Sequence, residues 1–131
     1  MAFFPEMSIC DVNKISMLGL AHVGDAVYEL LYRSKLCTDG HSNVAKMHTM
    51  TVSFVNAAAQ AAAAEKIAPR LTEDELAVYK RGRNAKVNSV PRHADISQYH
   101  KATGLEALFG WLYLQGKTER INELFSEITG E

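Results

Sequence analysis

The chain has 131 residues, 47% of them hydrophobic, so it can bury a core without disulfide bonds. Its formal net charge of -1 excludes a protein that coats nucleic acid through bulk charge, and any contact with nucleic acid must come from a local patch. Two cysteines without metal-ligand spacing, no secretory leader and no apolar run of membrane-spanning length favour a single cytoplasmic domain over residues 1–131, without membrane contact.

Hydrophobic periodicity predicts a helical first half. Over residues 15–33, apolar side chains recur at three- and four-residue spacing, which predicts a strongly buried helix that ends before Asp39. Its apolar positions are Met17, Leu18, Leu20, Ala21, Val23, Val27, Leu30 and Leu31. A second helix is predicted from a cap at Ser42 or Asn43 through Ala64, because its alanine-rich centre has the highest helix propensity in the chain.

The next segments are predicted to form a capped helix and a long loop. Thr72 and Glu75 have the spacing of a capping box, which predicts a helix over residues 72–81. The segment 83–97 is polar, contains several turn-forming residues and shows neither the helical nor the strand periodicity of apolar residues, so we expect a loop there. A long loop within a compact domain commonly has a functional role.

Two further helices are predicted at the end of the chain. Residues 98–114 regain the helical pattern, and Gly116 provides a natural stop. Thr118 is expected to cap the last helix. No segment alternates like a strand, so the predicted fold class is all-α.

Two carboxylates stand out inside these helices. Asp25 is in the middle of the predicted helix 15–33, and Glu106 is in the most hydrophobic helix of the second half. Burial of an unpaired carboxylate is costly or forces the group to take a proton, so each acid is expected to have a compensating partner. A shared Mg²⁺ would compensate both, because this cation prefers oxygen ligands and needs few protein carboxylates when a phosphate supplies the rest.

A structural alternative stays open, in which each acid pairs with a basic neighbour such as His22. Spacing alone does not favour the metal site over this alternative. The glycines next to the acids do favour it, because helical glycines such as Gly24 and Gly110 mark places where another backbone approaches closely.

Positive charge gathers between the two acids. From Lys80 to Lys101, cationic side chains strongly outnumber acidic ones, whereas the rest of the chain is net acidic. Local charge of one sign is the footprint of phosphate contact, although it also fits a solvated loop whose charges only aid solubility. The candidate nucleic-acid contacts are Arg81, Arg83, Asn84, Lys86 and Arg92.

Several separated segments resemble the ribonuclease III family. LAHVGDAVYELLYR, residues 20–33, is similar to the helix that carries the catalytic aspartate of that family, and TGLEALFGWLYL, residues 103–114, is similar to the helix with its catalytic glutamate. KRGRNAK and VPRHADISQY, residues 80–86 and 90–99, resemble the Mini-ribonuclease III subfamily, which consists of the catalytic domain alone. The likeness covers nearly the whole chain.

The resemblance implies a metal-dependent endoribonuclease that cleaves double-stranded RNA. By position, Asp25 and Glu106 would be the catalytic and metal-binding pair, with Mg²⁺ as cofactor. Ala21 and Thr103 stand where larger family members have two more acids. The resemblance also implies a homodimer without a separate double-stranded-RNA-binding domain, a 23S ribosomal RNA precursor as substrate and a large-subunit ribosomal protein as an assisting partner.

Two other classes of function stay open. A catalytically inactive, ribosome-associated module that binds double-stranded RNA would keep the fold and the basic segment, and the missing acids favour it. A helical protein-interaction domain would have no RNA affinity at any salt concentration. Glu29, one turn from Asp25, is a second-tier candidate for the site, but an ion pair with Arg33 is the stronger interpretation.

Overall fold

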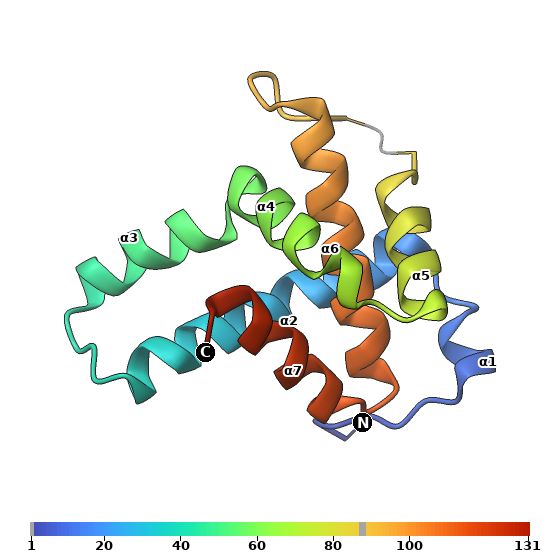
Figure 1. Ribbon diagram of the computed structural model, residues 1–131, viewed down its shortest axis with the longest axis horizontal. Helices are drawn as coiled ribbons and strands as arrows, with labels where there is room; N and C mark the ends of the chain where they lie inside the picture. The colour runs from blue at the N-terminus through green and yellow to red at the C-terminus, as the bar shows by residue number, and fades with distance from the viewer. Residues whose placement is uncertain (1, 87–88) are drawn as a thin grey trace.

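The computed structural model describes residues 2–86 and 89–131, and these residues form helices and connecting segments without a strand (Figure 1). The all-α prediction is therefore confirmed. None of the helices in these residues has the length and apolarity needed to cross a bilayer. The elements are α1 Ile9–Val12, α2 Met17–Thr38, α3 Val44–Val55, α4 Ala57–Ile67, the 3₁₀ turn η1 Ala68–Arg70, α5 Glu73–Arg83, α6 Ile96–Leu114 and α7 Thr118–Thr129.

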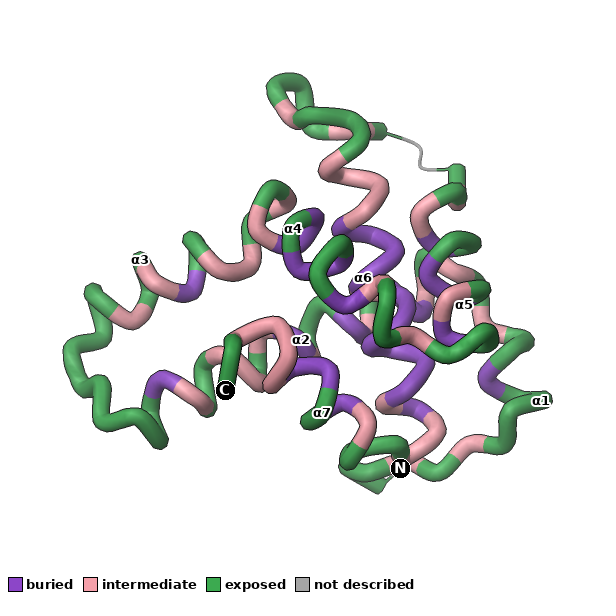
Figure 2. The backbone as a smooth tube through the Cα atoms, viewed as in Figure 1, coloured by how far each residue is buried: buried purple, intermediate pink, exposed green. Residues whose placement is uncertain are grey.

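Helix α6 is the centre of the fold. It packs against α2, α4, α5 and α7, and buried positions run along most of its length in Figure 2. Leu105, Leu108, Phe109 and Leu112 are fully buried on it. Helix α3 instead projects away from α6 (Figure 1), and Thr51 is its only fully buried residue. The apolar helix of the second half is therefore the element around which the others are arranged.

A pair of glycines brings the backbones of α2 and α6 into direct contact. A Cβ atom on Gly24 would lie 1.6 Å from the carbonyl oxygen of Glu106, and one on Gly110 would lie 2.0 Å from the carbonyl oxygen of Leu20. Side chains cannot occupy such space, so only glycine permits the two helices to cross this closely. The expectation that Gly24 and Gly110 mark a close approach is confirmed.

Local capping chemistry fixes several helix ends. Asn43 caps α3, and Thr72 with Glu75 forms the predicted capping box at the start of α5. Helix α6 begins at Ile96, two residues before the predicted start, because Asp95 accepts a hydrogen bond from the backbone of Gln98.

Two predictions about the helices are wrong, and one short helix was not predicted. The predicted helix from Asn43 to Ala64 is two helices, because the backbone at Asn56 is extended and its side chain caps α4. Thr118 is the first residue of α7 and not its cap; Lys117 precedes the helix without a side-chain cap. The short helix α1, with Ser8 as its cap, was not predicted.

The predicted burial of the first long helix is also only partly right. Leu20 and Ala21 are buried, whereas Leu18 and Leu30 are 41% and 52% exposed. Leu30 lines a groove together with residues of α6 and α7, and both leucines remain accessible to solvent. The predicted loop over residues 83–97 is confirmed only for the described part of residues 84–95, because Arg83 ends α5 and α6 begins at Ile96. Residues 87 and 88 lie outside the described part.

Replacement of Gly110 by alanine should disrupt the contact between α2 and α6. The new Cβ would meet backbone atoms, which cannot rotate away, so we expect a loss of at least about 3 kcal/mol in the free energy of unfolding. Urea denaturation followed by circular dichroism measures this. Gly19→Ala on α2, the partner helix in this crossing, is the control, because its Cβ would meet only side-chain atoms of Ile15 and Ser16, at 3.0 Å or more. Equal stability losses in both variants would contradict the role of the crossing.

Candidate active site

The helix crossing brings the two predicted acids to one place. Asp25 follows Gly24 on α2, and the backbone of Gly24 lies directly against that of Glu106 on α6. The carboxyl groups lie close enough for Asp25 to act on Glu106 through a side-chain hydrogen bond as well as through its charge. Two acids that lie 81 positions apart in the chain therefore share one site.

The two acids differ in their exposure to solvent. Glu106 is half-buried, whereas Asp25 is exposed. The prediction that Asp25 is a buried acid is therefore wrong, because α2 covers α6 with the Leu20 and Gly24 side of the helix and turns Asp25 and Ala26 toward solvent. The exposed carboxylate is accessible to a ligand, while the half-buried one is held inside the helix packing.

Burial controls the protonation of Glu106. Loss of solvent raises the pKa of its carboxyl to about 8, and the hydrogen bond and charge of Asp25 add to this rise. The side-chain amide of Gln60 acts in the opposite direction and lowers the pKa of Glu106. Without a cation, the neutral form of Glu106 is thus favoured at neutral pH.

No basic side chain neutralises the pair among the described residues. Every ion pair found there joins other groups, and Arg33 pairs with Glu29 at 2.8 Å. The alternative in which each acid forms an ion pair with a basic neighbour is therefore not found among the described residues. Glu29 makes the ion pair expected for it.

The donor set fits a hard divalent cation. The Asp25 and Glu106 carboxyl groups are adjacent, and a divalent cation could bind to both in place of the proton on Glu106. A depression of about 410 Å³ opens beside Asp25. Ala26, Glu29, Leu30 and Arg33 complete the lining of this depression. Among residues 2–86 and 89–131, no three His, Cys, Asp or Glu side chains come together as a metal-binding group, so solvent or substrate would have to supply the other ligands.

The two positions that lack acids are filled by buried, uncharged side chains. Ala21 is 7% exposed, and so is Thr103, whose hydroxyl donates a hydrogen bond to the carbonyl oxygen of Tyr99 at 3.0 Å. Neither residue adds a carboxylate to the pair formed by Asp25 and Glu106. The acid site of this chain consists of two carboxylates and the polar group of Gln60.

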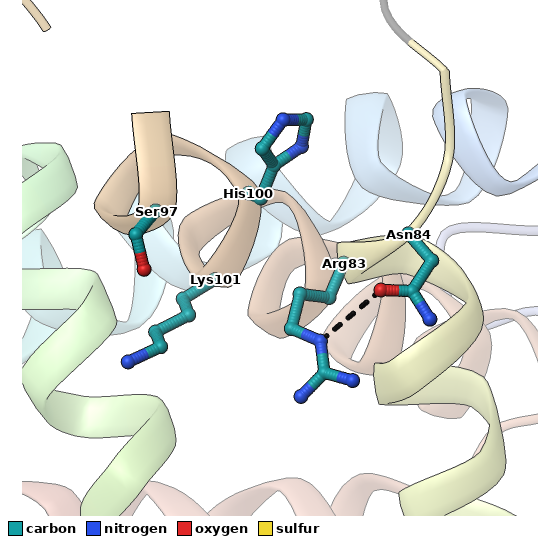
Figure 3. Close-up of a pocket in the computed structure, with 5 residues that line it drawn as sticks. All are labelled: Arg83, Asn84, Ser97, His100 and Lys101. Atoms are coloured by element: carbon teal, nitrogen blue, oxygen red, sulfur yellow. Dashed lines mark hydrogen bonds between the residues drawn. The ribbon is translucent and has the colours of Figure 1, made fainter. Parts of the chain in front are cut away.

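A second, basic depression of about 370 Å³ lies where the end of α5 meets the start of α6 (Figure 3). Nε of Arg83 donates a hydrogen bond to Oδ1 of Asn84 at 3.3 Å, and Nζ of Lys101 pairs with the carboxylate of Glu65 on α4. The depression is lined by Arg83, Asn84, Ser97, His100 and Lys101.

The structure joins only part of the predicted basic group in this depression. Arg83 and Asn84 are together, whereas Arg81, Lys86 and Arg92 are exposed but do not line it. Arg81 and Arg83 lie in the last turn of α5 and not in the loop. Sequence reasoning missed His100 as a lining residue, although it precedes Glu106 by less than two turns, or about 9 Å along the helix axis.

Comparison with known proteins agrees with this arrangement. The model of the ribonuclease III domain matches residues 18–117. The Mini-ribonuclease 3 of Symbiobacterium thermophilum is 45% identical over 90% of this chain and 91% of its own length, and that of Brevibacillus brevis is 43% identical over 92% and 93%. A crystal structure of a protein from Fusobacterium nucleatum superimposes with a TM-score of 0.82 at 34% identity, over 92% of this chain and 94% of the other.

These matches show the class of protein, which is an all-helical endoribonuclease of the ribonuclease III type. The chain belongs to the ribonuclease III family, in its Mini-ribonuclease III branch. The predicted resemblance is thereby confirmed over most of the chain.

The raised pKa of Glu106 predicts a specific pH dependence of stability in metal-free protein. The folded chain holds this proton up to about pH 8, and the unfolded chain releases it near its ordinary value of 4.5. The contribution of this bound proton to the free energy of unfolding is therefore fully present below pH 4.5 and is lost as pH rises through about 8. Glu106→Gln removes this dependence.

Urea unfolding in the presence of EDTA, between about pH 5 and about pH 9, measures the effect. Over this range, the free energy of unfolding of Glu106→Gln should rise by about 2–4 kcal/mol relative to that of the unchanged protein. This is less than the full pKa shift of Glu106 implies, because solvent partly screens the carboxyl group. Glu29→Gln is the control and should show no such gain. A stability difference that stays constant across this range would contradict the protonation of Glu106.

Proposed function

We propose that this endoribonuclease cleaves double-stranded RNA with Mg²⁺ held by Asp25 and Glu106, and that it matures the precursor of 23S ribosomal RNA. The observation that carries the proposal is the contact between α2 and α6, which brings together two acids that have no basic partner among residues 2–86 and 89–131. Residues 1–131 would act as one catalytic domain.

The two acids have different tasks in this proposal. Glu106 must give up its proton before it can serve as a ligand, and its half-buried position then fixes one carboxylate oxygen in a constant place. Asp25 is exposed and presents its carboxylate to the solvent side, where an RNA phosphate can approach. When bound, Mg²⁺ supplies positive charge that activates a water for attack on the phosphodiester and stabilises the charge that develops on the phosphate.

The basic residues are proposed to hold the RNA backbone. Arg83 and Asn84 face the depression at the junction of α5 and α6, and Arg81, Lys86 and Arg92 add exposed charge or donors around it. Recognition would depend on helix shape, phosphates and 2′-hydroxyls, since the deep groove of A-form RNA hides the base edges. We therefore expect little sequence preference.

A homodimer and a large-subunit ribosomal protein as a partner are further parts of the proposal. Support for a dimer comes from an apolar groove of about 210 Å³ next to the acid site. Leu30, which is 52% exposed, lines both this groove and the depression beside Asp25. A second copy that covers Leu30 would bring two acid sites close together, as cleavage of both strands requires.

The alternative proposal is a catalytically inactive, ribosome-associated module that binds double-stranded RNA. One observation favours it: Ala21 and Thr103 contribute no carboxylate, and the described residues hold no larger cluster of metal ligands. Cleavage assays separate it from the enzyme, because the module would bind duplex RNA and leave it intact.

Asp25→Asn and Glu106→Gln should each lower the rate of duplex RNA cleavage in Mg²⁺ by at least about a thousandfold, because each removes one of two charged ligands. Both variants should still bind the RNA. Single-turnover cleavage of a labelled duplex measures the rate, and filter binding measures the affinity. Glu29→Gln, on the same face of α2, is the matched control and should stay within a few fold of the unchanged protein. Cleavage by Asp25→Asn at the rate of the unchanged protein would contradict the metal-site proposal.

Replacement of Arg81, Arg83 and Lys86 by alanine should weaken duplex RNA binding and flatten its salt dependence. If all three contact phosphates, the slope of log affinity against log salt should fall in magnitude by about 2–3. Fluorescence anisotropy across a salt series measures this slope. A charge-matched triple of Lys14, Arg70 and Lys117, which lie outside α5 and its loop, is the control. An equal effect of both triples would mean that bulk charge, and not this patch, holds the RNA.

A further inference from the structure

Gln60 is a polar side chain on α4, whose other buried residues are three alanines and Ile67. It is 2% exposed, and its buried neighbours on the helix are Ala61, Ala63 and Ala64. Helix α4 packs directly against α6, the helix that carries Glu106. An amide is an expensive choice for such a contact, because burial removes its water and an apolar side chain would pack equally well.

The amide of Gln60 has an unused donor that lies beside Glu106. Within the described residues, Nε2 of Gln60 is shielded from solvent and has no hydrogen-bond partner. The same side chain favours the ionised form of Glu106, so its amide interacts with the carboxylate. A buried donor without a partner, on a helix packed against the one that carries this acid, is placed to complete its hydrogen bond with the Glu106 carboxylate.

We propose that Gln60 is a positioning residue for Glu106, an inference that rests on the proposed metal site. Its Nε2 donates a hydrogen bond to one oxygen of the ionised Glu106 carboxylate from the α4 side, and this leaves the other oxygen directed toward Asp25 and a divalent cation. Glu106 would thus have a fixed orientation, which the missing acids at Ala21 and Thr103 cannot provide.

An amide suits this task better than a charged group. Lysine or arginine at this position would neutralise Glu106 and compete with the cation, and a carboxylate would add to the repulsion between Asp25 and Glu106. Glutamine donates through its amide at any pH and adds no charge. Polar groups that hold a metal ligand in this way commonly change metal affinity by about 10–100-fold when they are replaced.

Gln60→Met tests the proposal, because methionine keeps the length and the helix propensity of glutamine but cannot donate a hydrogen bond. We expect Mn²⁺, titrated into the RNA-free protein and followed by electron paramagnetic resonance, to bind about tenfold or more weakly. In cleavage assays kcat should fall by a similar factor, with KM for duplex RNA within twofold. The thermal unfolding midpoint should not fall, since an unpartnered amide is removed.

Thr51→Val is the matched control, because Thr51 is also a buried polar residue but lies on α3 and bonds only to the backbone of its own helix. It should leave Mn²⁺ affinity and kcat unchanged. A folded Gln60→Met protein with Mn²⁺ affinity and kcat within twofold of the unchanged chain would overturn the positioning role and leave Gln60 as a packing residue.

A measurement on the unchanged protein covers the case in which Gln60→Met does not fold. The side-chain amide signals of Gln60 in a ¹H–¹⁵N spectrum should shift when Mg²⁺ is added, and the same addition to Glu106→Gln should leave them in place. If the Asp25 backbone signal responds to Mg²⁺ and the Gln60 amide does not, Gln60 has no positioning role while the metal site stands. If neither responds, the metal site itself fails, and the role of Gln60 fails with it.

Discussion

The contact between the backbones of Gly24 and Gly110 is the constraint on which the rest of this structure depends. Helices with side chains at their crossing point lie about 8–10 Å apart, and glycine permits the backbones to touch. Here that approach removes solvent from Glu106 and places it against the turn that carries Asp25. The unusual chemistry of the site thus follows from a packing contact, and the acids themselves contribute little to holding the helices together.

Close placement of two acids has an electrostatic cost that shapes the whole site. The described residues supply no cation to offset it, and the chain instead keeps a proton on Glu106. A site of this kind is poised to exchange that proton for a divalent cation when pH or metal concentration rises. With only two carboxylates, the geometry depends more strongly on the neighbouring packing, from the glycines on one side and from Gln60 on α4 on the other.

The sequence predicted those features that depend on local chemistry. The capping box at Thr72 and the cap at Asn43 could be recognised because each depends on residues within a few positions. Asp25 and Glu106 stood out as single acids within apolar segments, and their role as metal ligands stays a prediction. The break at Asn56 was missed because the propensity of the alanine run outweighed one cap-forming residue. The exposure of Asp25 and the approach of Gln60 to Glu106 depend on which helix covers which face. That is a tertiary property, which helical periodicity in one segment cannot determine.

The central claim is that Asp25 and Glu106 share one divalent cation. Crystals of the unchanged chain soaked with Mn²⁺ and measured at an anomalous wavelength test it most directly. The account predicts a peak within coordination distance of a carboxylate oxygen of each acid, which disappears in Glu106→Gln crystals treated in the same way. No peak between the two carboxylates at saturating Mn²⁺, or a peak held by other residues, would contradict it.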